Sequence, residues 1–178
     1  MIDREDIVAA LISSAPNGRL TSRVRFQKTV YLLQELGFKS GFDFEYHHYG
    51  PYSRELDNAI ADARTFDLIE ERIEHRKRDG ASYSAFASKY EGKAEAFSGL
   101  GREKVGKLID LFVNTNVTVL ELAATIDWLW RVERFSDWRS EIKVRKGQKT
   151  ESGRLEKAVE LLRNLALVPP EPAGFSAL

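Results

Sequence analysis

The sequence predicts an α+β fold that is mainly α-helical, with a winged-helix-like amino-terminal half packed with a carboxy-terminal helical lobe. Apolar residues recur at helical spacing through most of the chain, two stretches in the first half alternate at strand spacing, and turn-forming residues separate these segments. We expect one globular unit. Residues 1–95 would form the winged-helix-like module of three helices, a short strand and a β-hairpin, residues 96–168 the helical lobe, and residues 169–178 a loose tail.

The first two helices are predicted from apolar periodicity and from their end signals. One is predicted at residues 4–15, where apolar side chains share a face before a Pro-Asn-Gly turn. The other begins after Thr21 or Ser22, either of which is a suitable N-cap. It runs to Gly37, because glycine commonly ends a helix.

The strands of this half are predicted from period-two alternation. Aromatic residues alternate with polar ones at residues 42–47, which indicates a short half-buried strand. Ser53 is a suitable cap for a third helix, which we expect to fade near Phe66. A second alternating stretch at residues 68–90, interrupted by the turn signal Asp79-Gly80, predicts the β-hairpin.

The second half is expected to be helical. One helix ends near Asn114, and the capping-box pattern Thr118-Val119-Leu120-Glu121 predicts the start of another, which continues to about Glu133. The apolar positions of this second helix run nearly all the way round, which is typical of a buried central helix. A short helix at 135–142, a lysine-rich connector at 143–150 and a last helix at 152–167 complete the expected order.

Three tryptophans lie near the end of the predicted central helix and just after it. Trp128 and Trp130 are expected to pack in the core. Trp138 stands between two charged residues, so we expect it to be partly exposed and available to a partner or to a second copy of the chain. A homodimer is therefore one expected assembly.

The composition limits the class of function. Lys plus Arg and Asp plus Glu both number 27 in 178 residues, so the chain lacks the positive excess that is typical of nucleic-acid binders. The absence of cysteine excludes disulfides and cysteine-ligated zinc. With neither a signal-peptide pattern nor an apolar run of about 20 residues, we expect a cytoplasmic protein without a membrane segment.

Two neighbouring stretches carry a combined motif. Arg25-Phe26-Gln27-Lys28-Thr29-Val30-Tyr31-Leu32-Leu33 lies on the predicted second helix, and Tyr46-His47-His48-Tyr49-Gly50-Pro51-Tyr52-Ser53 leads into the third, where Leu56 follows. Over about residues 5–95 this resembles the YwgA-like and SocA-like proteins that share the Panacea antitoxin domain, in which a helix "lQKlvYll" precedes "Y..YGPYS..L". Thr29 departs from the pattern, since that family usually has an apolar residue there.

The resemblance implies a small bacterial regulatory protein. Such proteins are often antitoxins that neutralise a toxin by direct contact, and sometimes adaptors or prophage-associated factors, with no known catalytic activity. We therefore expect a protein partner, such as a toxin. Seven residues match the structural part of the family motif: Gln27, Lys28, Tyr31, Gly50, Pro51, Ser53 and Leu56.

The aromatic cluster around Gly50-Pro51 has two interpretations. In the structural one, glycine and proline shape the turn, Ser53 caps the third helix and the tyrosines pack the junction. In the functional one, amphipathic aromatic residues anchor a partner protein. The two are compatible, and the candidate partner-binding residues are Tyr46, His48, Tyr49, Tyr52 and Arg54.

A basic tip on the predicted hairpin supports an alternative function. Arg76, Lys77 and Arg78 could contact a phosphate backbone, as expected of a winged-helix DNA-binding regulator. The simpler interpretation, which we favour, is a solvated tip whose charges are balanced by nearby acidic residues. The pair Glu70-Glu71 is expected to lie on a solvated strand surface.

No catalytic or metal-binding pattern stands out. His47 and His48 are adjacent and would point to opposite faces of a strand, and His75 has no matching ligand spacing. Ser53 is better explained as a helix cap than as a nucleophile. We expect no enzyme, metal or cofactor, and we keep a hydrolase or nuclease of unrecognised type as a third hypothesis.

Overall fold

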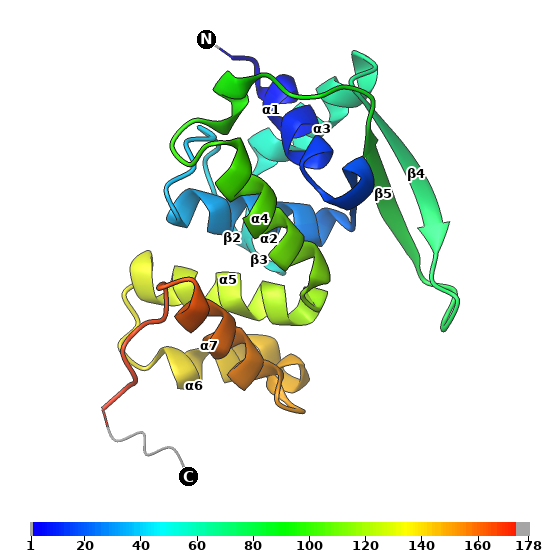
Figure 1. Ribbon diagram of the computed structural model, residues 1–178. Helices are drawn as coiled ribbons and strands as arrows, with labels where there is room; N and C mark the ends of the chain where they lie inside the picture. Colours follow the sequence, from blue (N-terminus) through cyan, green and yellow to red (C-terminus); the bar gives the residue numbers. More distant parts are fainter. Residues whose placement is uncertain (1, 174–178) are drawn as a thin grey trace.

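Residues 2–173 are described by the computed structural model, which shows the predicted α+β fold with helices in the majority (Figure 1). The first half contains α1 (Arg4–Ser13), β1 (Arg19–Thr21), α2 (Arg23–Glu35), β2 (Glu45–His47), β3 (Gly50–Tyr52), α3 (Arg54–Thr65), β4 (Ile69–His75) and β5 (Ser82–Ser88). The second half contains α4 (Arg102–Asn114), α5 (Val117–Arg131), α6 (Trp138–Lys146) and α7 (Arg154–Asn164). Single 3-10 turns lie at η1 (Pro16–Gly18), η2 (Ala94–Phe97) and η3 (Gly147–Thr150).

The β-hairpin belongs to a three-stranded antiparallel sheet with the order β1-β5-β4. Leu20 in β1 lies opposite Phe86 in β5, and both side chains are fully buried. The far end of the hairpin extends away from the body of the molecule (Figure 1). Three helices, a first strand and a hairpin that pairs with it confirm the winged-helix-like prediction. β1 itself was not predicted, because three residues are too few to show a period-two pattern.

The predicted strand at residues 42–47 is only partly correct. The strand is limited to Glu45–His47, and it pairs with β3 in a separate two-stranded ribbon in which Tyr46 lies opposite Pro51. Phe42 is buried without strand pairing, so its place in the alternating pattern reflects packing alone. The residues expected to form only a turn therefore supply the second strand of this ribbon.

Helix starts agree with the predicted caps except at α5. Ser22 accepts a hydrogen bond from the Arg25 amide at 3.3 Å, and Ser53 accepts one from the Leu56 amide at 3.2 Å. The capping box at residues 118–121 is wrong, because the N-cap of α5 is two residues earlier: Asn116 accepts from the Thr118 amide at 2.9 Å. Glu121 is consequently free to take part in a buried ion-pair cluster inside the molecule.

The end of the chain also differs from the prediction. The expected short helix and connector are shifted, since α6 runs to Lys146 and leaves only the turn η3 before α7. Trp138 is fully buried instead of partly exposed, and its indole donates to the Pro170 carbonyl oxygen at 2.9 Å. Arg139 pairs with Glu171 at 2.8 Å. The expected loose tail therefore packs on α6 at these positions, and its last residues, 174–178, lie outside the described part of the chain.

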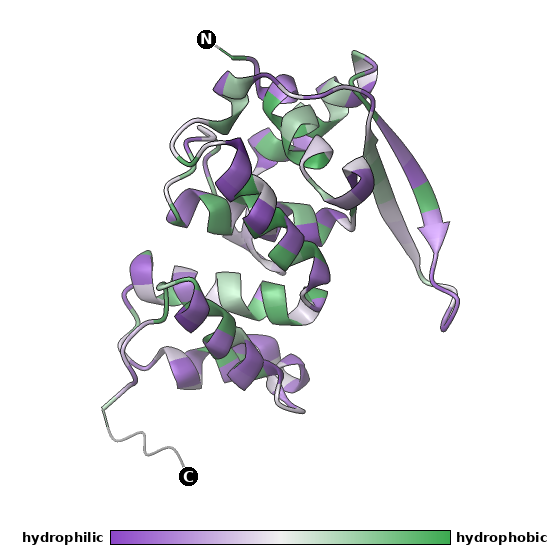
Figure 2. Cartoon of the chain, viewed as in Figure 1, coloured by the Kyte–Doolittle hydropathy of each residue, from purple (hydrophilic) through white to green (hydrophobic). Residues whose placement is uncertain are grey.

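A single hydrophobic core connects the two halves. α5 packs against α2 on one side and against α6 and α7 on the other (Figure 1), as the central position predicted for it requires. Its residues from 119 to 129 are all buried. Figure 2 shows that β4, in contrast to α5, is mainly hydrophilic. Within residues 2–173 no single helix combines the length and apolarity needed to cross a membrane; α4 and α5 meet the criteria only as a pair bent by 119°.

Candidate functional site

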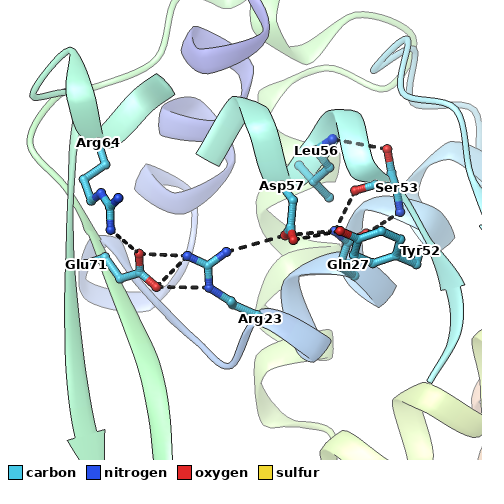
Figure 3. Close-up of polar contacts among 8 residues, drawn as sticks. All are labelled: Arg23, Gln27, Tyr52, Ser53, Leu56, Asp57, Arg64 and Glu71. Atoms are coloured by element: carbon cyan, nitrogen blue, oxygen red, sulfur yellow. Dashed lines mark hydrogen bonds and ion pairs between the residues drawn. The ribbon is translucent and has the colours of Figure 1, made fainter. Parts of the chain in front are cut away.

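Gln27 joins α2 to the start of α3. Its side-chain amide donates to the Ser53 carbonyl oxygen at 2.9 Å and accepts from the Ser53 amide at 2.8 Å, both in the interior (Figure 3). The same amide lies 3.3 Å from Asp57. Because Ser53 also caps α3, one glutamine fixes both the direction of the chain entering α3 and the first turn of that helix. The family-like motif thus has a structural role at this position.

An ion-pair chain attaches the hairpin to the same two helices (Figure 3). Arg23 donates to both carboxylate oxygens of Glu71 at 2.9 Å and lies 3.6 Å from Asp57, while Arg64 pairs with Glu71 at 3.2 Å. The Glu71 side chain is only 6% exposed, so the prediction of a solvated surface is wrong for this residue. Burial opposes its ionisation, but hydrogen bonds from Ser84 and Arg23 outweigh burial and lower the pKa of Glu71.

Lys28 is buried beneath the β2–β3 ribbon. It is 1% exposed, and its ammonium donates to the Pro51 carbonyl oxygen. Burial lowers the pKa of Lys28 to about 7; Glu121 opposes this shift, whereas the charges of Lys146 and Lys149 add to it. The lysine is therefore an internal support of the ribbon rather than a surface charge.

Glu121 forms ion pairs with the two other lysines whose charges act on Lys28. Lys146 and Lys149 each donate to its carboxylate at 2.9 Å, and Lys146 also donates to the His48 carbonyl oxygen at 3.1 Å. The Lys146 and Glu121 side chains are 3% and 5% exposed. The turn of the β2–β3 ribbon is thus tied to both α5 and α6.

Replacing Lys28 with Met is expected to flatten the pH dependence of stability. The unfolded pKa near 10.5 exceeds the folded value of about 7, so the unfolded chain binds more protons and the free energy of unfolding rises with pH in this window. Loss of this one titration removes on the order of 2 kcal/mol of that rise between about pH 7 and pH 9. Urea unfolding at the two pH values measures it.

The exposed lysine Lys104 provides the control for that experiment. Lys104→Met should leave the pH dependence of wild type unchanged, because it removes a lysine of the same kind from the surface and leaves the buried cluster intact. If Lys28→Met kept the wild-type slope, Lys28 would not be the group that releases its proton on folding.

Tyr31 and Tyr46 lie deeper than a partner-binding role would require. The Tyr31 hydroxyl donates to Asp127 at 2.8 Å, and burial raises the pKa of both groups. Tyr46 is partly buried, with its ring 4.6 Å from the Arg145 guanidinium and 6.4 Å from the Trp128 ring. Tyr46 therefore offers a partner less surface than the other predicted binding residues.

The other predicted partner-binding residues meet around a hollow of about 460 Å³ between the β2–β3 ribbon and the first turns of α2 and α3. Tyr49 is 49% exposed, with the Lys149 ammonium 4.8 Å from its ring centre and the His48 ring beside it. Tyr52 donates to Asp57 at 2.9 Å. Arg54 is exposed, and no carboxylate of the described residues lies within ion-pair distance of it. The structure thus brings His48, Tyr49, Tyr52 and Arg54 to one site.

Two more hollows continue this one toward the hairpin. A hollow of about 560 Å³ shares Val24 and Tyr49 with the first and reaches Arg76, and a smaller one of about 290 Å³ shares Val24 and includes Ile73. Val24 lines all three hollows. We call this continuous surface the α2 groove. Its further lining residues include Thr21, Ser22, Arg23, Arg25, Ser82 and Tyr83.

Sequence reasoning did not find Val24 or Ile73 as site residues. Val24 reads as one more apolar position of a helix, and only the fold shows that it lies in the groove. The sequence around Ile73 could have indicated a surface site, because it places an apolar residue among charged ones on a predicted hairpin. In the structure this side chain is 62% exposed. Large apolar side chains exposed beside a hollow are typical of interaction surfaces.

The predicted nucleic-acid contacts do not form one surface with α3. Lys77 and Arg78 lie exposed at the hairpin tip, and among the described residues neither has an ion-pair partner. Arg76 pairs with Asp79 at 3.1 Å and lines the groove. α3, the helix that a winged-helix protein would place in the major groove, carries two arginines against three acidic residues. This helix therefore lacks the positive charge expected of a DNA-reading element.

The function of the site is not indicated by a metal-binding cluster among the described residues or by a match to a known protein. No cluster of three or more His, Asp or Glu side chains in residues 2–173 is arranged to hold a metal ion. No protein-family model matches this chain, and a search of curated proteins finds no match.

Proposed function

We propose that this protein is a non-enzymatic regulatory binding protein, antitoxin-like, which neutralises or adapts a partner protein by direct contact through the α2 groove. The observation that carries the proposal is the groove itself. Three adjoining hollows share Val24, and exposed Tyr49 and Ile73 lie along them. Aromatic and aliphatic side chains beside a concave surface are the usual anchors of protein interfaces.

The arrangement of the polar groups supports binding rather than catalysis. The buried motif residues Gln27 and Lys28 are occupied by backbone groups of Ser53 and Pro51. They hold the ribbon that carries Tyr49. The winged-helix DNA-binding regulator is the alternative, supported by the exposed cations Lys77 and Arg78 and weakened by the charge of α3.

Tyr49→Ala is expected to abolish capture of the partner while leaving the fold intact. Tyr49 is about half exposed, so its truncation removes little of the core. Loss of an aromatic anchor at the centre of an interface typically costs about 2 kcal/mol or more of binding free energy. Affinity purification of tagged wild type and variant from the native host, followed by mass spectrometry and a nucleic-acid assay of the eluates, measures it.

Phe66→Ala is the matched control, because Phe66 is an exposed aromatic residue that does not line the groove. It should retain the partner at the wild-type level. A partner that both variants retain equally would place the interface elsewhere. DNA that copurifies without a protein would favour the winged-helix regulator instead.

A further inference from the structure

Positive charge lies at both ends of the α2 groove. Arg54 at one end has no carboxylate within ion-pair distance among the described residues. Arg76 lines the other end, where its partner Asp79 is itself exposed. Positive charge beside a hollow favours a ligand of the opposite sign.

The wall between these ends carries one more cation, Arg25. The Arg25 guanidinium donates to the Thr115 carbonyl oxygen at 2.6 Å and to that of Phe112. Its Nε is buried and has no hydrogen-bond partner among the described residues. Burial lowers the pKa of Arg25. Because the Arg25 side chain lines one of the hollows, it adds a further positive group to the groove wall, and this is a second feature that favours an anionic occupant.

An apolar patch lies between the cations of the groove. Val24 lines all three hollows, Tyr49 lines two of them and Ile73 lines the third. An occupant that satisfied the cations at both ends would therefore have to place an apolar group between its negative charges.

A nucleic acid matches this pattern poorly. Its phosphates recur at every nucleotide, whereas the aliphatic side chains of Val24 and Ile73 interrupt the cationic lining of the groove. A polypeptide can separate its carboxylates by an apolar side chain, so it fits both features.

We infer that the α2 groove binds an extended acidic segment of the partner protein, with one apolar side chain over Val24 and carboxylates near Arg54 and Arg76 on either side. This inference rests on the proposed function, and it specifies the chemistry of the partner's segment. Serine and threonine hydroxyls at Thr21, Ser22 and Ser82 provide further hydrogen-bonding groups along its path.

The test is selection of a random peptide library displayed on phage against the immobilised full-length chain. Four versions are compared: wild type, Tyr49→Ala, Arg54→Glu and, as a charge-reversal control on α7, Arg163→Glu. Arg54→Glu should fold, because an acidic side chain in the first turn of a helix is favourable. A pool of single-stranded DNA is measured in parallel at low and high salt.

Enriched peptides should carry Asp or Glu on both sides of an apolar residue. Their affinity should fall about tenfold or more in Arg54→Glu, should be lost in Tyr49→Ala and should be unchanged in Arg163→Glu. Peptides without acidic bias that still require Tyr49 would overturn this inference and leave the proposed function standing. Peptides indifferent to Tyr49, or no enrichment at all, would count against both. Salt-sensitive DNA binding that Arg54→Glu abolishes would overturn the inference in favour of a nucleic acid.

Discussion

Glu121→Gln is expected to lower the free energy of unfolding by about 3–5 kcal/mol, the usual cost of removing one partner from a buried ion pair. The Glu121 carboxylate accepts from both Lys146 and Lys149 at 2.9 Å and stabilises the charge of Lys28 nearby. Glutamine keeps the shape and one acceptor oxygen but removes the charge that balances these lysines. Urea denaturation of the variant at neutral pH measures the loss.

Two comparisons separate this charge effect from a loss of packing. Glu103→Gln removes an exposed carboxylate that pairs with the exposed Lys107, so it should cost less than about 1 kcal/mol. Lys146→Met combined with Glu121→Gln should recover much of the stability, because the uncompensated buried charge is removed as well. A double variant no more stable than Glu121→Gln alone would contradict the account of the cluster.

Gly50→Ala is expected to destabilise the protein by about 3 kcal/mol. Gly50 has φ +85°, a conformation that costs a residue with a Cβ roughly 1–2 kcal/mol. A Cβ at this position would also lie 2.5 Å from the Thr125 hydroxyl oxygen on α5, so the ribbon or the helix would have to move. The midpoint and slope of chemical unfolding measure the combined effect.

Gly80→Ala isolates the backbone part of that cost. Gly80 has φ +68° in the hairpin turn, and a Cβ there would meet no atom within 4 Å, so the expected loss is only about 1 kcal/mol. Adding Thr125→Ala to Gly50→Ala should restore part of the difference by removing the obstructing oxygen. Equal losses for the two glycine variants would show that the close approach to α5 is unimportant.

Local sequence signals predicted the winged-helix-like half well where they were strong. Ser22 and Ser53 cap the helices expected of them, and the turn at Asp79-Gly80 closes the hairpin. These features depend on chain-local hydrogen bonding and backbone conformation, which residue types at neighbouring positions reveal.

Tertiary contacts decided the features that the sequence did not reveal. Glu121 looks like part of a capping box, yet its partners are Lys146 and Lys149, which follow it in the sequence by 25 and 28 positions. Trp138 looks exposed beside charged residues, but a segment about 30 positions away covers it. Pairings over such distances leave no trace in local periodicity, so only the folded chain shows them.

The site was partly predicted for the same reason. Tyr49, Tyr52, His48 and Arg54 belong to one short stretch and stay together in the fold. Val24 and Ile73 join them only because α2 and the hairpin are brought alongside, with Arg23 and Glu71 fixing their separation. The family-like motif residues Gln27, Lys28 and Gly50 hold this arrangement from inside.

The most direct test of the α2 groove as a protein-binding surface is site-specific photo-crosslinking in the native host. A photoreactive phenylalanine analogue is placed at Tyr49 in one version and at Phe66, another exposed aromatic position, in a second. We predict one discrete protein adduct from position 49 and none from position 66. Adducts from position 66 alone, or a nucleic-acid adduct from position 49, would contradict the proposed function.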